Sequence, residues 1–292
     1  MDVAVIGLGS MGYGMAISLV RAQHQVWGLD VNADAQARFR DDGGQPGAVP
    51  WDALDAVVLA VLTGAQTDVV LFGDDGIARK LRSAVVLSCA TMSAEQARGL
   101  ADRLPDGLHY LDAPISGGAA KAATGNLSIM ASGSRAAFAA ARPVLEACAA
   151  TVFDLGDAPG TGSAMKSVNQ LLAGVHIAAM AEAMTFGISQ GIDPDTFLRV
   201  IPHCAGTSWM LENRAPHVAA GDYAPRSAVD IWPKDLGIVL DAARASGFGA
   251  PLAASAMQQF LAASGSGLGR EDDAAVAKVY ARNAGLRLPG AP

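Results

Sequence analysis

The chain has 292 residues, a hydrophobic fraction of 51% and a formal net charge of −7 at pH 7. This length suffices for two domains with sizeable cores, and the acidic balance excludes the basic surface that a nucleic-acid partner would require. Three widely spaced cysteines, without a Cys-x-x-Cys or His-x-x-x-His pair, predict no disulfide framework and no metal site. We expect the three thiols to be buried, in a reducing compartment.

Short β-branched runs alternate with Ala-rich stretches in the first half of the chain. Strands are predicted at 3–6, 25–29, 56–61, 84–88 and 109–111, and helices at 12–23, 33–41 and 93–104. Several of these strands are apolar throughout, as is typical of parallel strands covered on both faces. The order predicts an α/β fold with a Rossmann-like doubly wound sheet. Residues 128–131 and 151–154 are expected to add strands at its far edge.

No strand is predicted after residue 157. A long helix is expected over 162–190, followed by helices at 194–201, 234–246, 251–264 and 274–284 and a frayed tail at 286–292. We therefore predict a Rossmann-like domain over residues 1–157 and an all-helical domain over 158–292. The apolar stretch from Leu171 to Met184 is too short and too polar to span a bilayer, so we expect a buried helix, no membrane partner and a cytoplasmic protein.

A glycine-rich turn follows the first strand directly and opens the first helix: Gly7, Leu8, Gly9, Ser10, Met11 and Gly12. Gly7 permits a tight turn, Gly9 lets the backbone approach a pyrophosphate, and Gly12 allows close helix–strand contact. The helix dipole and the free N–H groups favour phosphates at this point. The turn therefore predicts a dinucleotide site; the alternative is a glycine-rich turn without a ligand.

An acidic residue, Asp30, ends the second predicted strand. A carboxylate at this position accepts hydrogen bonds from the adenosine ribose hydroxyls and repels a 2′-phosphate. Val31 and Asn32 follow it in place of an arginine, so the cofactor is predicted to be NAD. Alternatively, Asp30 is a helix cap or a loop acid, although Asn32 or Asp34 could cap the next helix.

Two further segments suggest chemistry. Ser116, Gly117 and Gly118 follow the fifth strand and offer a hydroxyl and open backbone N–H groups to a carboxylate, unless they form only a domain-edge turn. Lys166 enters an apolar helix and shares one face with Asn169 and Gln170 at i, i+3 and i+4. A lysine near a helix N-terminus opposes the dipole, which favours a role in proton transfer over that of a solvated surface lysine.

These motifs together resemble the 3-hydroxyacid dehydrogenase family over nearly the whole chain. The resemblance covers the turn extended by Gly14, the segments 112–118 and 160–170, and Lys234-Asp235 in a late helix. It implies that Lys166 is the catalytic acid/base, that Ser116, Gly117 and Gly118 hold the substrate carboxylate, and that Asn169 orients the substrate hydroxyl. It further implies that Thr91 lies near the nicotinamide and that Lys234, supported by Asp235, closes over the site.

The chain departs from the commonest family pattern at two points. Val61-Leu62-Thr63 replaces a Leu-Pro pair, and Gln170, expected to contact the substrate, replaces a second asparagine. With the local segments 28–32, 65–67, 174–178 and 229–235, these departures resemble the L-threonate dehydrogenase branch of the family.

The expected reaction is NAD-dependent oxidation of a small hydroxy acid, with Lys166 accepting the hydroxyl proton and no metal. Two alternatives remain open: reduction of a semialdehyde or glyoxylate with NAD(P)H, and a catalytically silent nucleotide-binding module. The resemblance and the apolar long helix also predict a homodimer or homotetramer.

Overall fold

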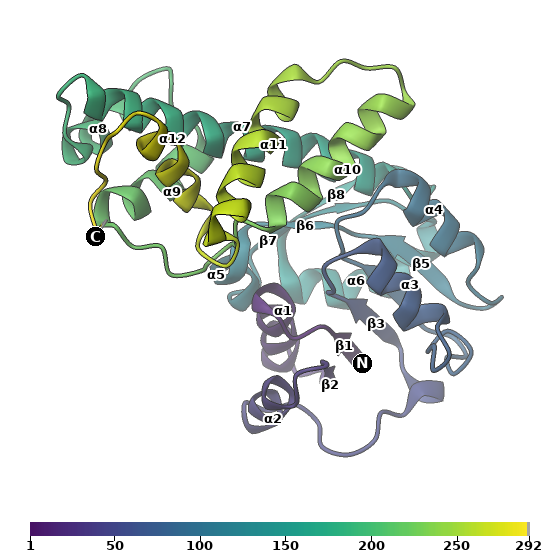
Figure 1. Cartoon of the computed structure of the whole chain (residues 1–292). Coiled ribbons are helices and arrows are strands. Elements are labelled where there is room, and N and C mark those ends of the chain that lie inside the picture. Colours follow the sequence, from purple (N-terminus) through teal and green to yellow (C-terminus); the bar gives the residue numbers. More distant parts are fainter. Residues whose placement is uncertain (291–292) are drawn as a thin grey trace. The chain divides into compact units, whose positions relative to one another are not determined.

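The chain divides into two compact units, shown in chain order in Figure 1. The computed structural model describes residues 1–290. The N-terminal unit comprises Met1–Ser167 and the C-terminal unit Val168–Pro292. Helix α7 (Thr161–Ser189) begins in the first unit and continues into the second. The domain boundary at residue 157 stays a prediction.

The N-terminal unit contains a five-stranded parallel sheet in the order β2-β1-β3-β4-β5. Its strands are β1 (Asp2–Ile6), β2 (Gln25–Leu29), β3 (Ala56–Leu59), β4 (Val85–Ser88) and β5 (His109–Asp112). The predicted doubly wound sheet is therefore confirmed. The chain leaves β1 toward β2 and returns on the other side of β1 as β3, so the strand order reverses there. Open α/β sheets bind ligands outside the carboxyl ends of their strands at such a reversal.

Helices cover both faces of this sheet because successive side chains of a strand point to opposite faces. Val3 and Val5 lie in one core with α1 (Ser10–Arg21) and α6 (Arg135–Cys148), whereas Ala4 lies in the other core with α3 (Gly64–Phe72) and α4 (Ala94–Asp102). Figure 1 shows α3 and α4 beside each other. Helix α2 (Ala33–Asp41) contributes the fully buried Phe39 beside β2.

The strands expected at the far edge of the main sheet belong to a separate sheet, so that prediction was wrong. This sheet has the order β6-β7-β8, formed by β6 (Ile115–Ser116), β7 (Leu127–Ala131) and β8 (Ala149–Asp154). The reason is a chain reversal through α5 (Gly118–Ala123), which returns β7 antiparallel to β6. An antiparallel bridge between Asp112, the last residue of β5, and Ser132, which follows β7, connects the two sheets.

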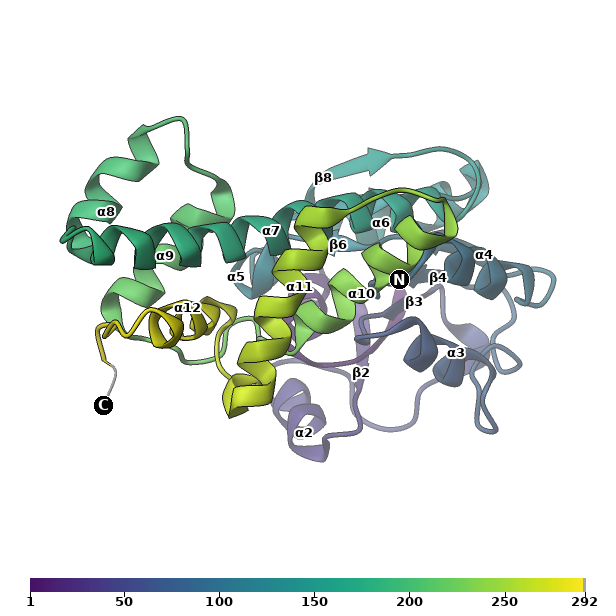
Figure 2. The ribbon, with the colours of Figure 1, turned by 45° about the horizontal axis from the view of Figure 1, so that its top comes forward.

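The C-terminal unit is helical. It contains the remainder of α7, α8 (Pro194–Val200), η2 (Ile201–His203), α9 (Trp209–Ala220), α10 (Ile231–Ala245), α11 (Pro251–Ala263), η3 (Ser264–Leu268), η4 (Asp273–Val276) and α12 (Ala277–Asn283). Its core surrounds Ile177 and Met184 of α7, with Trp232 stacked on Phe260 at a centroid distance of 5.5 Å. Figure 2 shows α10 and α11 side by side.

Helix α7 is long and apolar enough to cross a membrane by length and composition alone. Ile177, Met180 and Met184 of this helix are at most 1% exposed and belong to the core of the C-terminal unit. Their burial identifies α7 as a core helix of this unit.

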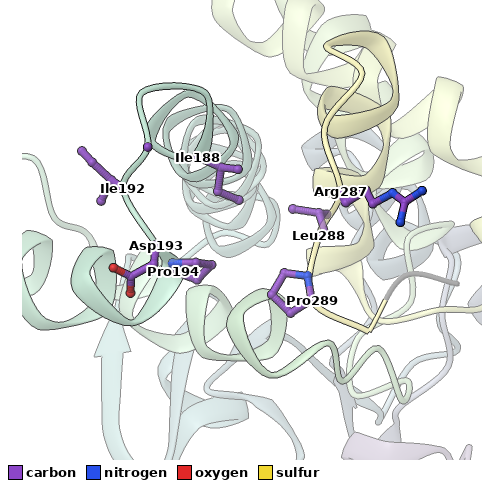
Figure 3. Close-up of a pocket in the computed structure, with 8 residues that line it drawn as sticks. Ile188, Ile192, Asp193, Pro194, Arg287, Leu288 and Pro289 are labelled. Atoms are coloured by element: carbon purple, nitrogen blue, oxygen red, sulfur yellow. The ribbon is translucent and has the colours of Figure 1, made fainter.

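Two smaller expectations were wrong. The tail is not frayed over its described part, because Leu288 is 6% exposed and joins the C-terminal core. Leu288 and Ile188 line a hollow of about 390 Å³, and Figure 3 shows the two side chains facing each other. Residues 291–292 lie outside the described residues. Cys89 and Cys148 are buried as expected, but Cys204 is exposed because it follows the short η2 at the surface.

Candidate active site

The glycine turn joins β1 to α1 and has the geometry that a pyrophosphate requires. Gly7 has φ +95°, and a Cβ on it would lie 2.6 Å from the Ala60 carbonyl oxygen. A Cβ on Gly12 would lie 1.9 Å from the Gly7 carbonyl oxygen, so only glycine fits. A Cβ on Gly9 would meet nothing within 4 Å. The turn is therefore tight on its inner side and open at Gly9, where a cofactor's phosphates would approach the backbone.

The remaining turn residues differ in exposure. Leu8 is buried, Met11 is half-buried, and Ser10, the first residue of α1, is exposed. The Gly9–Ser10 side of the turn is therefore accessible to a ligand.

Asp30 ties the end of β2 to this turn. Its Oδ2 accepts a hydrogen bond from the Leu8 N–H at 2.6 Å, and its Oδ1 accepts one from the Asn32 N–H at 2.8 Å. The side chain of Asn32 caps α2 by accepting from Asp34 and Ala35 N–H groups, so Asp30 is not the cap of that helix. Each carboxylate oxygen retains capacity for a ribose hydroxyl. Val31 is fully exposed.

Thr91 and the segment 116–118, which were predicted to belong to the site, follow the carboxyl ends of β4 and β5. Thr91 is half-buried in the connection between β4 and α4. Ser116 ends β6 and is half-buried, and Gly117 and Gly118 have φ +136° and +78° where α5 begins. Parallel strands present their carboxyl ends at one edge, so the turn, Asp30 and Thr91 share that edge, and Ser116 follows within a few residues of β5.

The segment Val61-Leu62-Thr63 leads directly into the start of α3. Thr63 caps α3 by accepting from the Gln66 N–H at 3.0 Å, while the Gln66 side chain accepts from the Leu62 and Thr63 N–H groups. This capping box satisfies backbone groups at the start of α3 and requires an N–H at position 63, which proline lacks.

A buried carboxylate from β5 holds the start of α7. Asp112 Oδ2 accepts from the Gly160 N–H at 2.9 Å and the Ser163 N–H at 2.8 Å, and Oδ1 accepts from the Ser163 hydroxyl at 2.7 Å. The Ser132 hydroxyl accepts from the Gly162 N–H at 2.9 Å. Burial raises the pKa of Asp112, and the hydrogen bonds from Ser163 and Gly160 act in the opposite direction. Asp112 thus supplies the negative partner that a helix N-terminus favours.

Lys166 lies one turn beyond this anchor, at i+3 from Ser163, and is 8% exposed. Because Asp112 is the last residue of β5, its bonds hold the start of α7 at the carboxyl edge of the sheet. The structure therefore gives the Lys166 helix a fixed starting point at the edge that carries Asp30 and the glycine turn. The sequence indicated a site at segment 112–118, but its pattern predicts no role for Asp112, Ser132 or Ser163.

A second set of polar residues is connected within the C-terminal unit. Asn169 Nδ2 donates to Gln170 Oε1 at 2.8 Å, and Gln170 Nε2 donates to Asp235 Oδ2. Lys234 Nζ lies 2.7 Å from Asp235 Oδ1, and Asp235 is 2% exposed. The structure thus brings Asn169, Gln170 and Lys234 together through one buried carboxylate.

Within residues 1–290, no group of three or more His, Cys, Asp or Glu side chains could hold a metal ion. The residues at the glycine turn fit a dinucleotide instead, because Gly9 leaves an open approach to the backbone and Asp30 offers carboxylate oxygens beside it.

Comparisons with known proteins agree with this geometry. Residues 2–156 match the family model described as the NAD binding domain of 6-phosphogluconate dehydrogenase. Residues 160–280 match the model described as NAD-binding of NADP-dependent 3-hydroxyisobutyrate dehydrogenase.

The chain is 49% identical to the L-threonate dehydrogenase of Cupriavidus necator, covering 99% of this chain and 98% of that protein. It is 35% identical to the 3-hydroxyisobutyrate dehydrogenase of Pseudomonas aeruginosa, covering 89% and 91%. The crystal structure of a 3-hydroxyisobutyrate dehydrogenase from Salmonella typhimurium is 47% identical, with a TM-score of 0.89 and coverage of 95% and 99%.

Fold, site and similarity together define a dehydrogenase that uses a nicotinamide dinucleotide. The chain belongs to the 3-hydroxyacid dehydrogenase family and is a hydroxyacid dehydrogenase. The predicted resemblance to the L-threonate dehydrogenase branch is confirmed by the full-length identity to that group.

Proposed function

We propose that this enzyme oxidises L-threonate, or a closely related small hydroxy acid, with NAD. The observation that carries the proposal is the full-length similarity to L-threonate dehydrogenases, at 47–49% identity. The choice of NAD over NADP rests on Asp30, whose carboxylate beside the turn repels a 2′-phosphate.

In the proposed mechanism, Lys166 accepts the proton of the substrate hydroxyl while a hydride leaves the carbinol carbon. The bound nicotinamide supplies the hydride acceptor. Ser116, Gly117 and Gly118 hold the substrate carboxylate, and Asn169 and Gln170 orient the hydroxyl. As the proton moves to it, the lysine gains a positive charge that stabilises the developing alkoxide, so orientation and electrostatics supply most of the rate.

The cofactor is proposed to contact Gly7, Leu8, Gly9, Ser10, Met11 and Gly12 through its pyrophosphate. Asp30 and Val31 then lie beside the adenosine ribose, and Thr91 and Lys234 lie toward the nicotinamide end. Asp235 positions the Lys234 amine, with which it forms an ion pair at 2.7 Å.

The proposal is tested with a panel of L-threonate, its enantiomer, glycerate and 3-hydroxyisobutyrate, following NADH formation. We expect the highest kcat/KM for L-threonate and a clear preference for NAD over NADP. A higher kcat/KM for another acid overturns the substrate assignment, and a preference for NADP overturns the role of Asp30.

The role of Lys166 is tested by Lys166→Ala. Loss of the acid/base group is expected to lower kcat by about 10²–10⁴-fold while NADH binding, measured by fluorescence, stays unchanged. Lys80→Ala is the matched control, because Lys80 is an exposed lysine of the same unit. Near-normal turnover of Lys166→Ala overturns the mechanism.

We also propose that the protein is a cytoplasmic homo-oligomer. Val168, Leu172 and Phe186 are 49–65% exposed on α7, and an apolar surface of this kind is typical of subunit contacts. Light scattering is expected to show a dimer or tetramer, and a monomeric mass contradicts the proposal.

A further inference from the structure

An open hollow of about 470 Å³ lies between the glycine turn and the first two turns of α2. It is lined by Leu8, Gly9, Ser10, Tyr13, Asn32, Asp34, Ala35 and Arg38. Asp30 borders it, because its carboxylate is bonded to the N–H groups of Leu8 and Asn32. The hollow therefore lies where the ribose of a bound adenosine would meet Asp30.

Arg38 is fixed on the wall of this hollow. Its guanidinium carbon lies 4.1 Å from the centroid of the Tyr13 ring, a cation–π contact. Tyr13 is itself held from two sides: its hydroxyl donates to Asp42, and Phe39 packs edge-on against it at 6.0 Å. Arg38 thus has a preferred orientation although it is exposed.

The charge of Arg38 is available for a ligand. No carboxylate of residues 1–290 forms an ion pair with Arg38. Two of the side chains that line the hollow are charged, Arg38 positively and Asp34 negatively. The N–H groups of Asp34 and Ala35 at the start of α2 already donate to the Asn32 side chain, so they are not open to an anion. An anion in this hollow therefore meets Arg38 as its cationic partner and Asp34 as a like charge.

We propose that Arg38, held on the ring of Tyr13, forms an adenosine 2′-phosphate subsite whose use Asp30 opposes. Asp30 borders the ribose position, so its carboxylate is the main determinant of the preference for NAD, and its removal lets the hollow bind the 2′-phosphate of NADP. This inference rests on the proposed NAD-dependent function and adds a second, opposing determinant of cofactor choice. Arginine suits it because a guanidinium binds phosphate through paired, charge-assisted hydrogen bonds.

The test measures binding of adenosine 2′,5′-bisphosphate and of adenosine 5′-monophosphate by titration calorimetry. The proteins are the wild type, Asp30→Asn, Arg38→Gln, the double variant and the control Arg40→Gln, an exposed arginine of α2 outside the hollow. Asp30→Ser is a second neutral variant in case the amide disturbs the turn. Thermal unfolding verifies that each variant is folded.

Asp30→Asn is expected to strengthen bisphosphate binding by about tenfold or more relative to the monophosphate. Arg38→Gln in that background is expected to remove the gain, whereas Arg40→Gln leaves it unchanged. The ratio of kcat/KM for NADP to that for NAD should change in the same order. Bisphosphate affinity rises in Asp30→Asn because the carboxylate no longer repels the 2′-phosphate. It falls again in the double variant because the 2′-phosphate has lost the guanidinium of Arg38.

Two results overturn the proposal: no gain in either neutral variant at position 30, or a gain that survives Arg38→Gln. The probes contain neither nicotinamide nor hydroxy acid, so a wrong substrate assignment does not affect the measurement. If neither nucleotide binds any folded variant, the dinucleotide site itself is wrong, and this proposal with it.

Discussion

Asp112 and Ser163 are joined by two hydrogen bonds, at 2.7 and 2.8 Å, across 51 residues of sequence. The first residue ends the last strand of the main sheet, and the second lies in the first turn of the helix that carries Lys166. This pair therefore links the sheet that is proposed to bind the cofactor to the residue that is proposed to move the proton.

Ser163→Ala should weaken this link without adding bulk. It removes a buried hydroxyl donor from Asp112, so the free energy of unfolding is expected to fall by about 1–3 kcal/mol. Because the start of α7 loses a fixed contact, kcat should fall while the KM for NAD stays unchanged. Urea unfolding and steady-state kinetics check both effects. Ser167→Ala, which removes a hydroxyl bonded within the same helix, is the control; equal effects of both changes would contradict a positioning role.

The titration of Asp112 should give stability an unusual pH dependence. Burial raises its pKa in the folded protein above the ordinary value of 3.8. The folded state then binds the proton more tightly than the unfolded state, so the stability contributed by this group falls as the pH rises from about 4 through the raised pKa. Asp112→Asn removes this slope. The difference in unfolding free energy, wild type minus variant, should decrease over that interval; a difference that increases has the wrong sign.

Gly9→Ala and Gly12→Ala should separate cofactor binding from stability. The methyl at position 9 meets no atom within 4 Å and the residue has φ −67°, so unfolding should change by less than about 0.5 kcal/mol. The same methyl occupies the proposed approach of the pyrophosphate, so NAD affinity should fall by about tenfold or more. The methyl at position 12 would lie 1.9 Å from the Gly7 carbonyl oxygen, so stability should fall by about 2 kcal/mol or more.

Calorimetric NAD binding and urea unfolding on both glycine variants give the comparison directly. Unchanged NAD affinity in a folded Gly9→Ala protein would remove the turn from the cofactor site.

Asp235→Asn should disturb the polar cluster of the C-terminal unit. Asp235 is buried and meets both Gln170 and Lys234, so its neutralisation leaves Lys234 without the paired charge. We expect a several-fold higher KM for NAD or for the hydroxy acid, together with a loss of stability of about 1–3 kcal/mol. Asp241→Asn on the same helix changes an exposed carboxylate and is the control. Kinetics equal to the wild type would show that the cluster is structural.

The main sheet was predictable because most of its strands are short apolar runs that can be recognised from neighbouring residues alone. Apolar runs such as Val3 to Ile6 and Val85 to Ser88 are buried on both faces, and their composition shows it. The second sheet was misplaced because β6 has only two residues and β8 is largely exposed. Neither has a burial pattern that composition reveals, so their pairing depended on the chain reversal through α5.

Helices α3, α6 and α9 were not predicted, for related reasons. Helices α6 and α9 contain Pro143 and Pro216, which are typical of breaks. Helix α3 has nine residues, and its start depends on the capping box of Thr63 and Gln66.

The sequence alone determined the glycine turn, Asp30 at the end of a strand, and a lysine near the start of an apolar helix. Each depends on residues that are neighbours in the chain, where backbone conformation and helix spacing act directly. Tertiary structure alone decided that Asp112 caps α7 and that Arg38 stacks on Tyr13. Both contacts join residues of different elements, which tertiary packing brings together. The spacing of these residues in the sequence therefore does not predict them.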